Sequence, residues 1–160
     1  MTIKIKTEEL MEGQIAPDFE LPDQEGNSVK LSQFKGSWVV LYFYPKDDTP
    51  GCTVEACSFR DNIKQFKDQG IVLLGVSLDS AESHGKFIKK FQLNFPLLCD
   101  VDAKVSRLYG VYKKKNMYAK LFWGIERSTF VMDPEGKIKK IFRRVKVDGH
   151  TDQVLQAIKA

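Results

Sequence analysis

Two long apolar segments constrain the fold of this chain more than any other feature. Ser37–Tyr44 and Ile71–Ser77 consist mainly of Val, Leu, Ile and aromatic residues, without the alternation of a half-exposed strand. Strands of this kind are typical of a sheet that is covered on both faces. The segment between them predicts a helix that ends at Gly70, because it places apolar or small residues three and four positions apart, at Ala56, Phe59, Ile63 and Phe66. The chain is therefore predicted to form an α/β fold, with a central mixed sheet flanked by helices.

Shorter segments extend this pattern at both ends of the chain. Phe19–Leu21 and Ser28–Leu31 flank turn-forming residues and predict an N-terminal β-hairpin. Ser128–Met132 and Lys137–Arg144 predict a second hairpin. The other predicted elements are a helical turn at Ser32–Gly36, a helix through Phe87, Ile88 and Phe91 capped by Asp79 or Ser80, a strand at Phe95–Leu98, helical turns at Lys104–Tyr109, a loop at Val111–Trp123, and a final helix at Asp152–Lys159 capped by Thr151.

The size and composition of the chain favour a single domain, residues 1–160. A hydrophobic content of 42% and a charged content of 29% are typical of a globular protein. The net charge of +4 is mild, and its basic residues gather at Lys113–Lys115, Lys139–Lys140 and Arg143–Arg144. We interpret these clusters as solvated surface and expect no nucleic-acid partner, because no zinc-finger or RNA-binding motif accompanies them.

The N-terminus and the cysteine content bear on the compartment. Residues 1–9 carry charges where a signal peptide needs an apolar core, and no apolar run approaches the roughly 20 residues that span a bilayer. We therefore expect a cytoplasmic protein without a membrane partner. The chain has 3 cysteines, an odd number, which in a reducing compartment indicates thiol chemistry or simple burial rather than a disulfide scaffold.

Cys52 stands where a buried strand gives way to a helix. The strand is broken by Pro45, Asp47, Asp48, Pro50 and Gly51. A helix N-terminus offers free amide groups and a partial positive charge, which stabilise a thiolate, the reactive form of cysteine. We therefore predict that Cys52 is reactive; the alternative is a small buried hydrophobic residue.

Residues 45–52, Pro-Lys-Asp-Asp-Thr-Pro-Gly-Cys, resemble the PxxxTxxC signature of peroxiredoxins, which are thiol peroxidases with a thioredoxin-like fold. The longer segment 43–57 looks like the Q subfamily, also called bacterioferritin comigratory proteins. The resemblance continues at Gly13–Phe19, Gly75–Ser77, Gly124–Phe130 and Gly149–His150, so it covers nearly the whole chain. It implies reduction of hydrogen peroxide and organic hydroperoxides without a metal, flavin or haem, by an enzyme that acts as a monomer; the alternative is a dimer that forms through aromatic residues such as Phe122 and Trp123.

The resemblance also implies roles for individual residues. Cys52 would be the peroxidatic cysteine, which the hydroperoxide oxidises to a sulfenic acid. Thr49 would hydrogen-bond the peroxide and the sulfur, and Pro45 would shield the thiolate from water. Arg127 matches the active-site arginine, whose charge favours the thiolate, and Glu55 matches the acidic residue that holds it. The alternatives are a surface ion pair for Arg127 and a helix-dipole role for Glu55.

Cys57 matches the second cysteine of the subfamily. It would condense with the sulfenic acid to an intramolecular disulfide, which thioredoxin or a similar dithiol protein would reduce. Residues five apart on an intact helix have Cα atoms about 8.7 Å apart, whereas a disulfide needs roughly 4.4–6.8 Å. We therefore expect the helix to unwind from Thr53 to about Phe59 in each catalytic cycle. The alternative for Cys57 is an inert core position.

The other candidate sites are weaker. Cys99 follows an apolar run and is predicted to be a buried residue at a strand end. A metal site made from Cys52, Cys57 and His84 or His150 is disfavoured, because the cysteine spacing differs from that of zinc knuckles and both histidines stand in polar sequence surroundings. Two other functions stay open: a thiol–disulfide oxidoreductase, although the C-x-x-C motif is absent, and a non-catalytic peroxide sensor.

Overall fold

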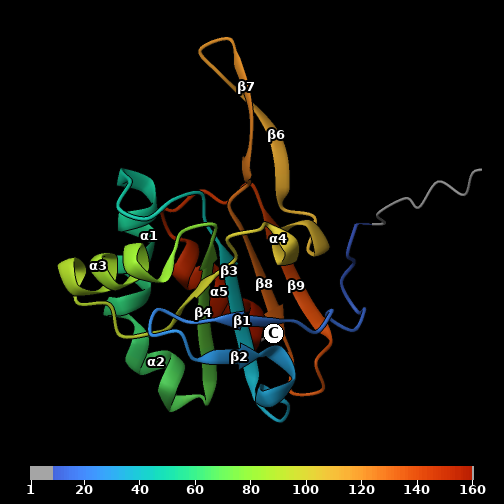
Figure 1. The fold of residues 1–160 in the computed structure, drawn as a ribbon. Helices are drawn as coiled ribbons and strands as arrows, with labels where there is room; N and C mark the ends of the chain where they lie inside the picture. The colour runs from blue at the N-terminus through green and yellow to red at the C-terminus, as the bar shows by residue number, and fades with distance from the viewer. Residues whose placement is uncertain (1–8, 160) are drawn as a thin grey trace, which may run out of the picture.

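A five-stranded mixed sheet forms the centre of the computed structural model, which describes residues 9–159 (Figure 1). Its strands, in spatial order, are β5 (Leu97–Cys99), β4 (Ile71–Ser77), β3 (Trp38–Phe43), β8 (Ser128–Met132) and β9 (Ile138–Arg143). β3, β4 and β5 run parallel, whereas β8 is antiparallel to β3 and β9 is antiparallel to β8. The two apolar segments therefore lie side by side at the centre of the sheet, as predicted.

Alternate residues of β3 belong to two hydrophobic cores, one on each face of the sheet. Leu41 and Phe43 pack in the core beneath the N-terminal hairpin, which β1 (Glu20–Pro22) and β2 (Ser28–Lys30) form as predicted. Val40 and Tyr42 pack in the other core, which also contains Cys52. Figure 1 shows the hairpin crossing in front of the sheet and helix α5 behind it. Burial of β3 on both faces explains its lack of polar alternation.

The helices cover both faces. They are α1 (Pro50–Asp61), α2 (Ile63–Asp68), α3 (Ala81–Phe91), α4 (Lys104–Leu108) and α5 (His150–Lys159), with a 3-10 helix η1 (Leu31–Phe34) after β2. α4 and η1 contribute to the first core, and the other helices contribute to the core around Cys52. Within residues 9–159, no helix has the length and apolar character needed to cross a membrane.

Three helix boundaries test the predicted caps. Ser80 caps α3, since its hydroxyl accepts a hydrogen bond from the Ser83 amide at 3.2 Å. The helix predicted between Cys52 and Gly70 is interrupted at Asn62, whose side chain donates to the Ser58 carbonyl at 2.7 Å and thereby competes with the helical backbone. α5 starts at His150, so the prediction that Thr151 caps it is wrong; Thr151 lies in the first turn.

Residues 111–123 were predicted to form a loop, and this prediction is wrong. They contribute most of a β-hairpin made of β6 (Tyr112–Met117) and β7 (Lys120–Ile125). The two-residue turn, Tyr118 and Ala119, has positive φ angles of 54° and 63°. Such turns usually contain Asn or Gly, so the sequence gives no turn signal. Because most of the hairpin is exposed, apolar and polar residues also fail to alternate between a buried and a solvated face.

Candidate active site

Cys52 lies in the first turn of α1, as predicted. Thr49 is the N-cap and has an extended backbone, and Pro50 is the first helical residue. The first backbone hydrogen bond of the helix runs from the Thr53 amide to the Thr49 carbonyl at 2.8 Å. The amides of the preceding residues, Gly51 and Cys52, therefore have no acceptor within the helix and favour an anion near this turn. The Cys52 side chain is buried, with the residue 2% exposed.

The guanidinium group of Arg127 joins Cys52 to Glu55. Its Nη2 donates to Cys52 Sγ at 3.2 Å, and its Nη1 donates to Glu55 Oε1 at 2.6 Å. Arg127 reaches this position from the short link between β7 and β8, far from α1 in the sequence. The guanidinium approaches the helix so closely that a Cβ atom added to Gly51 would lie only 3.1 Å from Arg127 Nη2. The structure thus brings together three residues that the sequence singled out, in an arrangement that places one positive charge beside the sulfur.

The carboxylate of Glu55 is buried and only half satisfied. Glu55 is 2% exposed, and its Oε2 has no hydrogen-bond partner among residues 9–159. Burial raises the pKa of Glu55 to about 7, an effect that the charge and hydrogen bond of Arg127 oppose. Burial alone would lower the pKa of Arg127, but the charges of Glu55 and Cys52 outweigh it and raise that pKa. The arginine therefore stays charged beside Cys52.

The raised pKa of Glu55 predicts a specific pH dependence of stability. The folded protein holds the Glu55 proton more tightly than the unfolded chain, whose pKa is 4.5, so this stabilisation is present below pH 4.5 and is lost as pH rises through about 7. We expect the loss to amount to about 3 kcal/mol. Urea unfolding of wild type and Glu55→Gln between about pH 4 and 8 measures it: the free energy of unfolding of wild type, relative to the variant, should fall with pH. A difference that is constant with pH would contradict the prediction.

The loop before α1 is held by Asp47, which the sequence analysis did not single out. The Asp47 amide donates to Asp79 Oδ2 at 2.8 Å, and its carboxylate accepts from the Tyr44 hydroxyl at 2.6 Å and the Ser83 hydroxyl at 2.8 Å. The Thr49 hydroxyl donates to the Lys46 carbonyl at 2.9 Å, and Pro45 is half-buried. An aspartate in a turn is usually exposed, and its partners are distant in the sequence, so no local signal indicates its burial.

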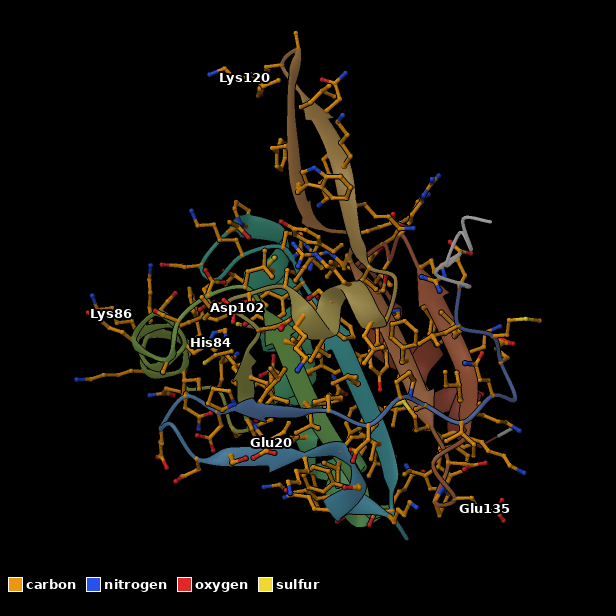
Figure 2. The ribbon with its side chains drawn as sticks, turned by 45° about the vertical axis from the view of Figure 1, so that its right-hand side comes forward. Glu20, His84, Lys86, Asp102, Lys120 and Glu135 are labelled. Atoms are coloured by element: carbon orange, nitrogen blue, oxygen red, sulfur yellow. The ribbon has the colours of Figure 1, made fainter. Side chains whose placement is uncertain are left out.

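Both histidines are buried, which their polar neighbours in the sequence did not indicate. His84, on α3 (Figure 2), is 0% exposed; its Nδ1 contacts Asp47 Oδ2 at 2.7 Å and its Nε2 lies 2.9 Å from the Leu98 carbonyl. His150 is 2% exposed, and its Nε2 lies 2.7 Å from Thr129 Oγ1. Burial lowers the pKa of His150. Some of their polar sequence neighbours share this burial: the Ser83 hydroxyl donates to the same Asp47 oxygen that His84 contacts, and Gln153 Oε1 lies 3.2 Å from His150 Nδ1.

One group of side chains has the spacing of metal ligands. Ligand atoms of Asp47, Asp79 and His84 lie within 4.8 Å of one another. The Asp79 Oδ2 atom already accepts from the Ser77 hydroxyl at 2.6 Å and from the Asp47 amide. The closest contacts of this group are therefore hydrogen bonds that fix the loop before α1.

The other two cysteines differ in their surroundings. Cys57 lies on α1 with Cys52 and is half-buried, and all three cysteines are free thiols. The next residue, Ser58, shares a 2.7 Å hydrogen bond with Thr151 of α5. Cys99 is buried at the end of β5, as predicted, and burial raises the pKa of its thiol to about 11. Cys99 is therefore a poor source of thiolate at neutral pH.

Comparisons with known proteins agree with this geometry. The AhpC/TSA family model matches residues 13–141. Peroxiredoxin Bcp of Bacillus subtilis is 50% identical over 159 residues, which are 99% of this chain and 97% of that protein, and Peroxiredoxin Bcp of Escherichia coli K12 is 45% identical over 150 residues, which are 94% and 96%. A solved bacterioferritin comigratory protein of Xanthomonas campestris is 45% identical with a TM-score of 0.84 over 88% of this chain and 90% of its own. The solved PrxQ of Xylella fastidiosa is 38% identical with a TM-score of 0.89 over 95% and 97%.

The matches confirm the predicted thioredoxin-like fold and the resemblance on which it was based. They cover nearly the whole chain and nearly the whole of each relative. The chain belongs to the AhpC/TSA family and is a peroxiredoxin, a thiol-dependent peroxidase.

Proposed function

We propose that Cys52 is the peroxidatic cysteine of this enzyme. Its thiolate sulfur attacks the terminal oxygen of a hydroperoxide, the O–O bond breaks, and water or an alcohol leaves after protonation, while Cys52 becomes a sulfenic acid. The observation that supports this role is the 3.2 Å contact between Cys52 Sγ and Arg127 Nη2, at the start of a helix. A fixed positive charge beside the sulfur favours the thiolate and the developing negative charge on oxygen.

The neighbouring residues support the same step. Glu55 holds the guanidinium through its 2.6 Å contact with Arg127. The Thr49 hydroxyl, next to the helix start, would exchange its hydrogen bond to the Lys46 carbonyl for one to the peroxide. Pro45, which has no amide hydrogen, would limit the access of water to the sulfur. Together these residues would position a peroxide between the Cys52 thiolate and the Arg127 guanidinium.

Cys57 is proposed to resolve the sulfenic acid. Its thiol sulfur attacks Cys52, water leaves, and an intramolecular disulfide forms, which thioredoxin or a similar dithiol protein reduces. Because both cysteines lie on α1, the helix has to unwind between them. Phe59 is 0% exposed and its ring lies 4.7 Å from that of Tyr42. We therefore place the C-terminal limit of the unwinding at Ser58 or Phe59.

This chemistry needs neither a second chain nor a cofactor. Both sulfur atoms come from one helix, so we propose that the enzyme acts as a monomer. Its dithiol reductant requires a compartment where thiols are kept reduced, which is the cytoplasm. An X. campestris relative is described by its alkyl peroxide reduction, and we propose organic hydroperoxides as well as hydrogen peroxide as substrates of this chain.

Hydroperoxide consumption and disulfide mapping test this function. With thioredoxin, its reductase and NADPH, wild type should consume peroxide, whereas Cys52→Ser should not exceed the rate without enzyme. Trypsin cleaves after Lys46 and Arg60 and leaves both cysteines in one peptide, and a glutamate-specific protease then cleaves between them at Glu55. After peroxide treatment without reductant, the two fragments should remain joined by a disulfide. Equal activity of wild type and Cys52→Ser would overturn the proposal, and fragments that separate would overturn the role of Cys57.

A further inference from the structure

The β6–β7 hairpin stands out from the body of the protein next to the proposed active site. Figure 1 shows it rising at the end of the molecule where α1 begins, and Figure 2 shows Lys120 at its tip. β7 ends at Ile125, two residues before Arg127, so the hairpin is attached directly to the arginine that contacts Cys52. A hydrogen bond of 2.8 Å from the Glu126 amide to the Val111 carbonyl closes its base.

The hairpin exposes large apolar side chains that contribute to neither core. The exposed fractions are 94% for Tyr118, 63% for Leu121, 40% for Phe122 and 57% for Trp123. The indole of Trp123 stacks on Tyr112 with ring centroids 5.5 Å apart, which fixes its orientation. Leu121 and Trp123 lie on one face of the hairpin and Phe122 on the other, so apolar side chains are exposed on both faces. Exposed apolar side chains surrounded by polar residues mark interaction surfaces. Aromatic residues are also enriched at the centres of protein interfaces.

The charge of the hairpin has one sign. Residues 112–125 contain Lys113, Lys114, Lys115 and Lys120, and no Asp or Glu. Among residues 9–159, no carboxylate lies within ion-pair distance of Lys114 or Lys120, whereas Lys113 lies 3.5 Å from Glu9. An uncompensated basic surface attracts acidic partners and accelerates their association.

Lys115 extends this basic surface toward the active site. Lys115 is half-buried. The methylene groups of its side chain pass close to Gly124, where an added Cβ atom would lie 3.7 Å from Lys115 Cδ. Burial lowers the pKa of Lys115, and the charge of Arg127 lowers it further, whereas the charges of Glu126 and Cys52 oppose this shift. The ammonium group of Lys115 is therefore close enough to Arg127 and Cys52 for their charges to act on it.

A protein that reduces the Cys52–Cys57 disulfide has to contact this region. A typical specific interface covers about 800 Å² on each partner, which is a disc of roughly 16 Å radius. Such a disc is about 32 Å across, so an interface that includes Cys52 at one side can also cover a strand of roughly 20 Å that ends two residues from Arg127. We propose that the β6–β7 hairpin is the docking surface for the reductant, an acidic protein that carries a dithiol. This inference rests on the proposed function.

Docking on the hairpin would serve a balanced exchange reaction. One thiolate of the partner attacks a sulfur of the Cys52–Cys57 disulfide, that S–S bond breaks, and the other sulfur leaves as a thiolate. The second thiol of the partner then attacks the mixed disulfide and releases the peroxiredoxin. The enzyme gains two electrons and two protons, and the partner dithiol becomes a disulfide. The hairpin contributes no reacting atom; it aligns the partner.

Charge reversal on the hairpin tests the proposal. Lys114 and Lys120 are both exposed, and we expect Lys114→Glu/Lys120→Glu to raise the KM for thioredoxin about tenfold. The readout is the ratio of turnover supported by thioredoxin to turnover supported by dithiothreitol, a small neutral dithiol that needs no docking surface. The matched control is Lys86→Glu/Lys89→Glu on α3, where both lysines are exposed and Lys86 lies far from the hairpin (Figure 2). Added salt should raise the wild-type KM and change the KM of the hairpin variant little.

The outcomes separate the docking surface from the chemistry. If peroxide leaves Cys52 unreacted in wild type, the proposed function fails, and the docking proposal fails with it. If wild type is oxidised and then reduced by both dithiols, but the KM for thioredoxin is equal in wild type and the hairpin variant, only the docking proposal fails. An equal rise in KM in the α3 control would also overturn it. Two further results would overturn it, each together with an unchanged KM for thioredoxin. Loss of binding to anionic phospholipid vesicles in the hairpin variant would identify a membrane as the occupant, and loss of self-association in sedimentation would identify a second copy of the chain.

Discussion

Replacing Arg127 with Met should slow the reaction of Cys52 with hydrogen peroxide by about 10²- to 10³-fold. The substitution removes the donor that lies 3.2 Å from Cys52 Sγ and the positive charge that favours the thiolate, while a side chain of similar length remains. Rapid mixing with peroxide, followed by alkylation of the remaining thiol, measures this step without any reductant. The control is Arg144→Met, because the Arg144 side chain is 87% exposed and its one ion pair within residues 9–159, at 3.5 Å from Glu126, is a weak surface contact.

The same substitution should destabilise the fold, because Glu55 loses the one partner that it has in the described part of the chain. A buried carboxylate without a counter-charge costs about 3–5 kcal/mol, and the pKa of Glu55 should rise further. Adding Glu55→Gln to Arg127→Met removes the buried charge, so the double variant should recover most of the free energy of unfolding. It should not recover the rate with peroxide.

This separation of stability from rate distinguishes the roles of the two residues. If the double variant regained both stability and rate, Arg127 would act only as a structural partner of Glu55. If Arg127→Met reacted with peroxide as fast as Arg144→Met, the contact with Cys52 Sγ would have no part in the reaction. In either case the proposed role of Arg127 would have to be withdrawn.

The strands and the position of Cys52 could be predicted because their signals are local. β3 and β4 are apolar on both faces, and the Pro- and Asp-rich loop before Cys52 cannot continue a strand. The partnership between Arg127 and Cys52 has no local signal, since 75 residues separate them. Only the resemblance to peroxiredoxins indicated it. The same holds for Glu55, whose position in the first turns of a helix is equally consistent with a surface role.

The features that the sequence did not reveal depend on tertiary contacts. Asp47 and His84 form a buried pair across 37 residues, and each is of a type that is usually at least partly exposed. The β6–β7 hairpin has neither a usual turn sequence nor one buried face, so neither of the two common signals of a hairpin is present. Secondary-structure propensity depends on residues that are close in the sequence, whereas the Asp47–His84 pair and the β6–β7 hairpin depend on residues that are close only in the folded structure.

The second large effect concerns Cys57. In Cys57→Ser, turnover supported by thioredoxin should fall at least about 100-fold, because no intramolecular disulfide can form, while the first reaction with peroxide keeps its rate. Cys52 should accumulate as a sulfenic acid, and excess peroxide should convert it to a sulfinic acid. Trapping with dimedone followed by mass spectrometry detects the first product, and intact mass detects the second. The control is Cys99→Ser, since Cys99 is buried and its pKa is raised to about 11.

The Cys57→Ser variant also tests whether α1 unwinds during the reaction. With α1 intact, Cys52 and Cys57 are held about 8.7 Å apart at their Cα atoms, beyond the roughly 4.4–6.8 Å of a disulfide. Unwinding has to break the Arg127–Glu55 contact, whereas Phe59 stays anchored in the aromatic core. The arrangement proposed to activate Cys52 is therefore the one that the proposed resolution step would dismantle. Hydrogen exchange should show amides from Thr53 to Cys57 losing protection on oxidation of wild type and keeping it in oxidised Cys57→Ser, and equal protection in both would mean that the disulfide forms without unwinding.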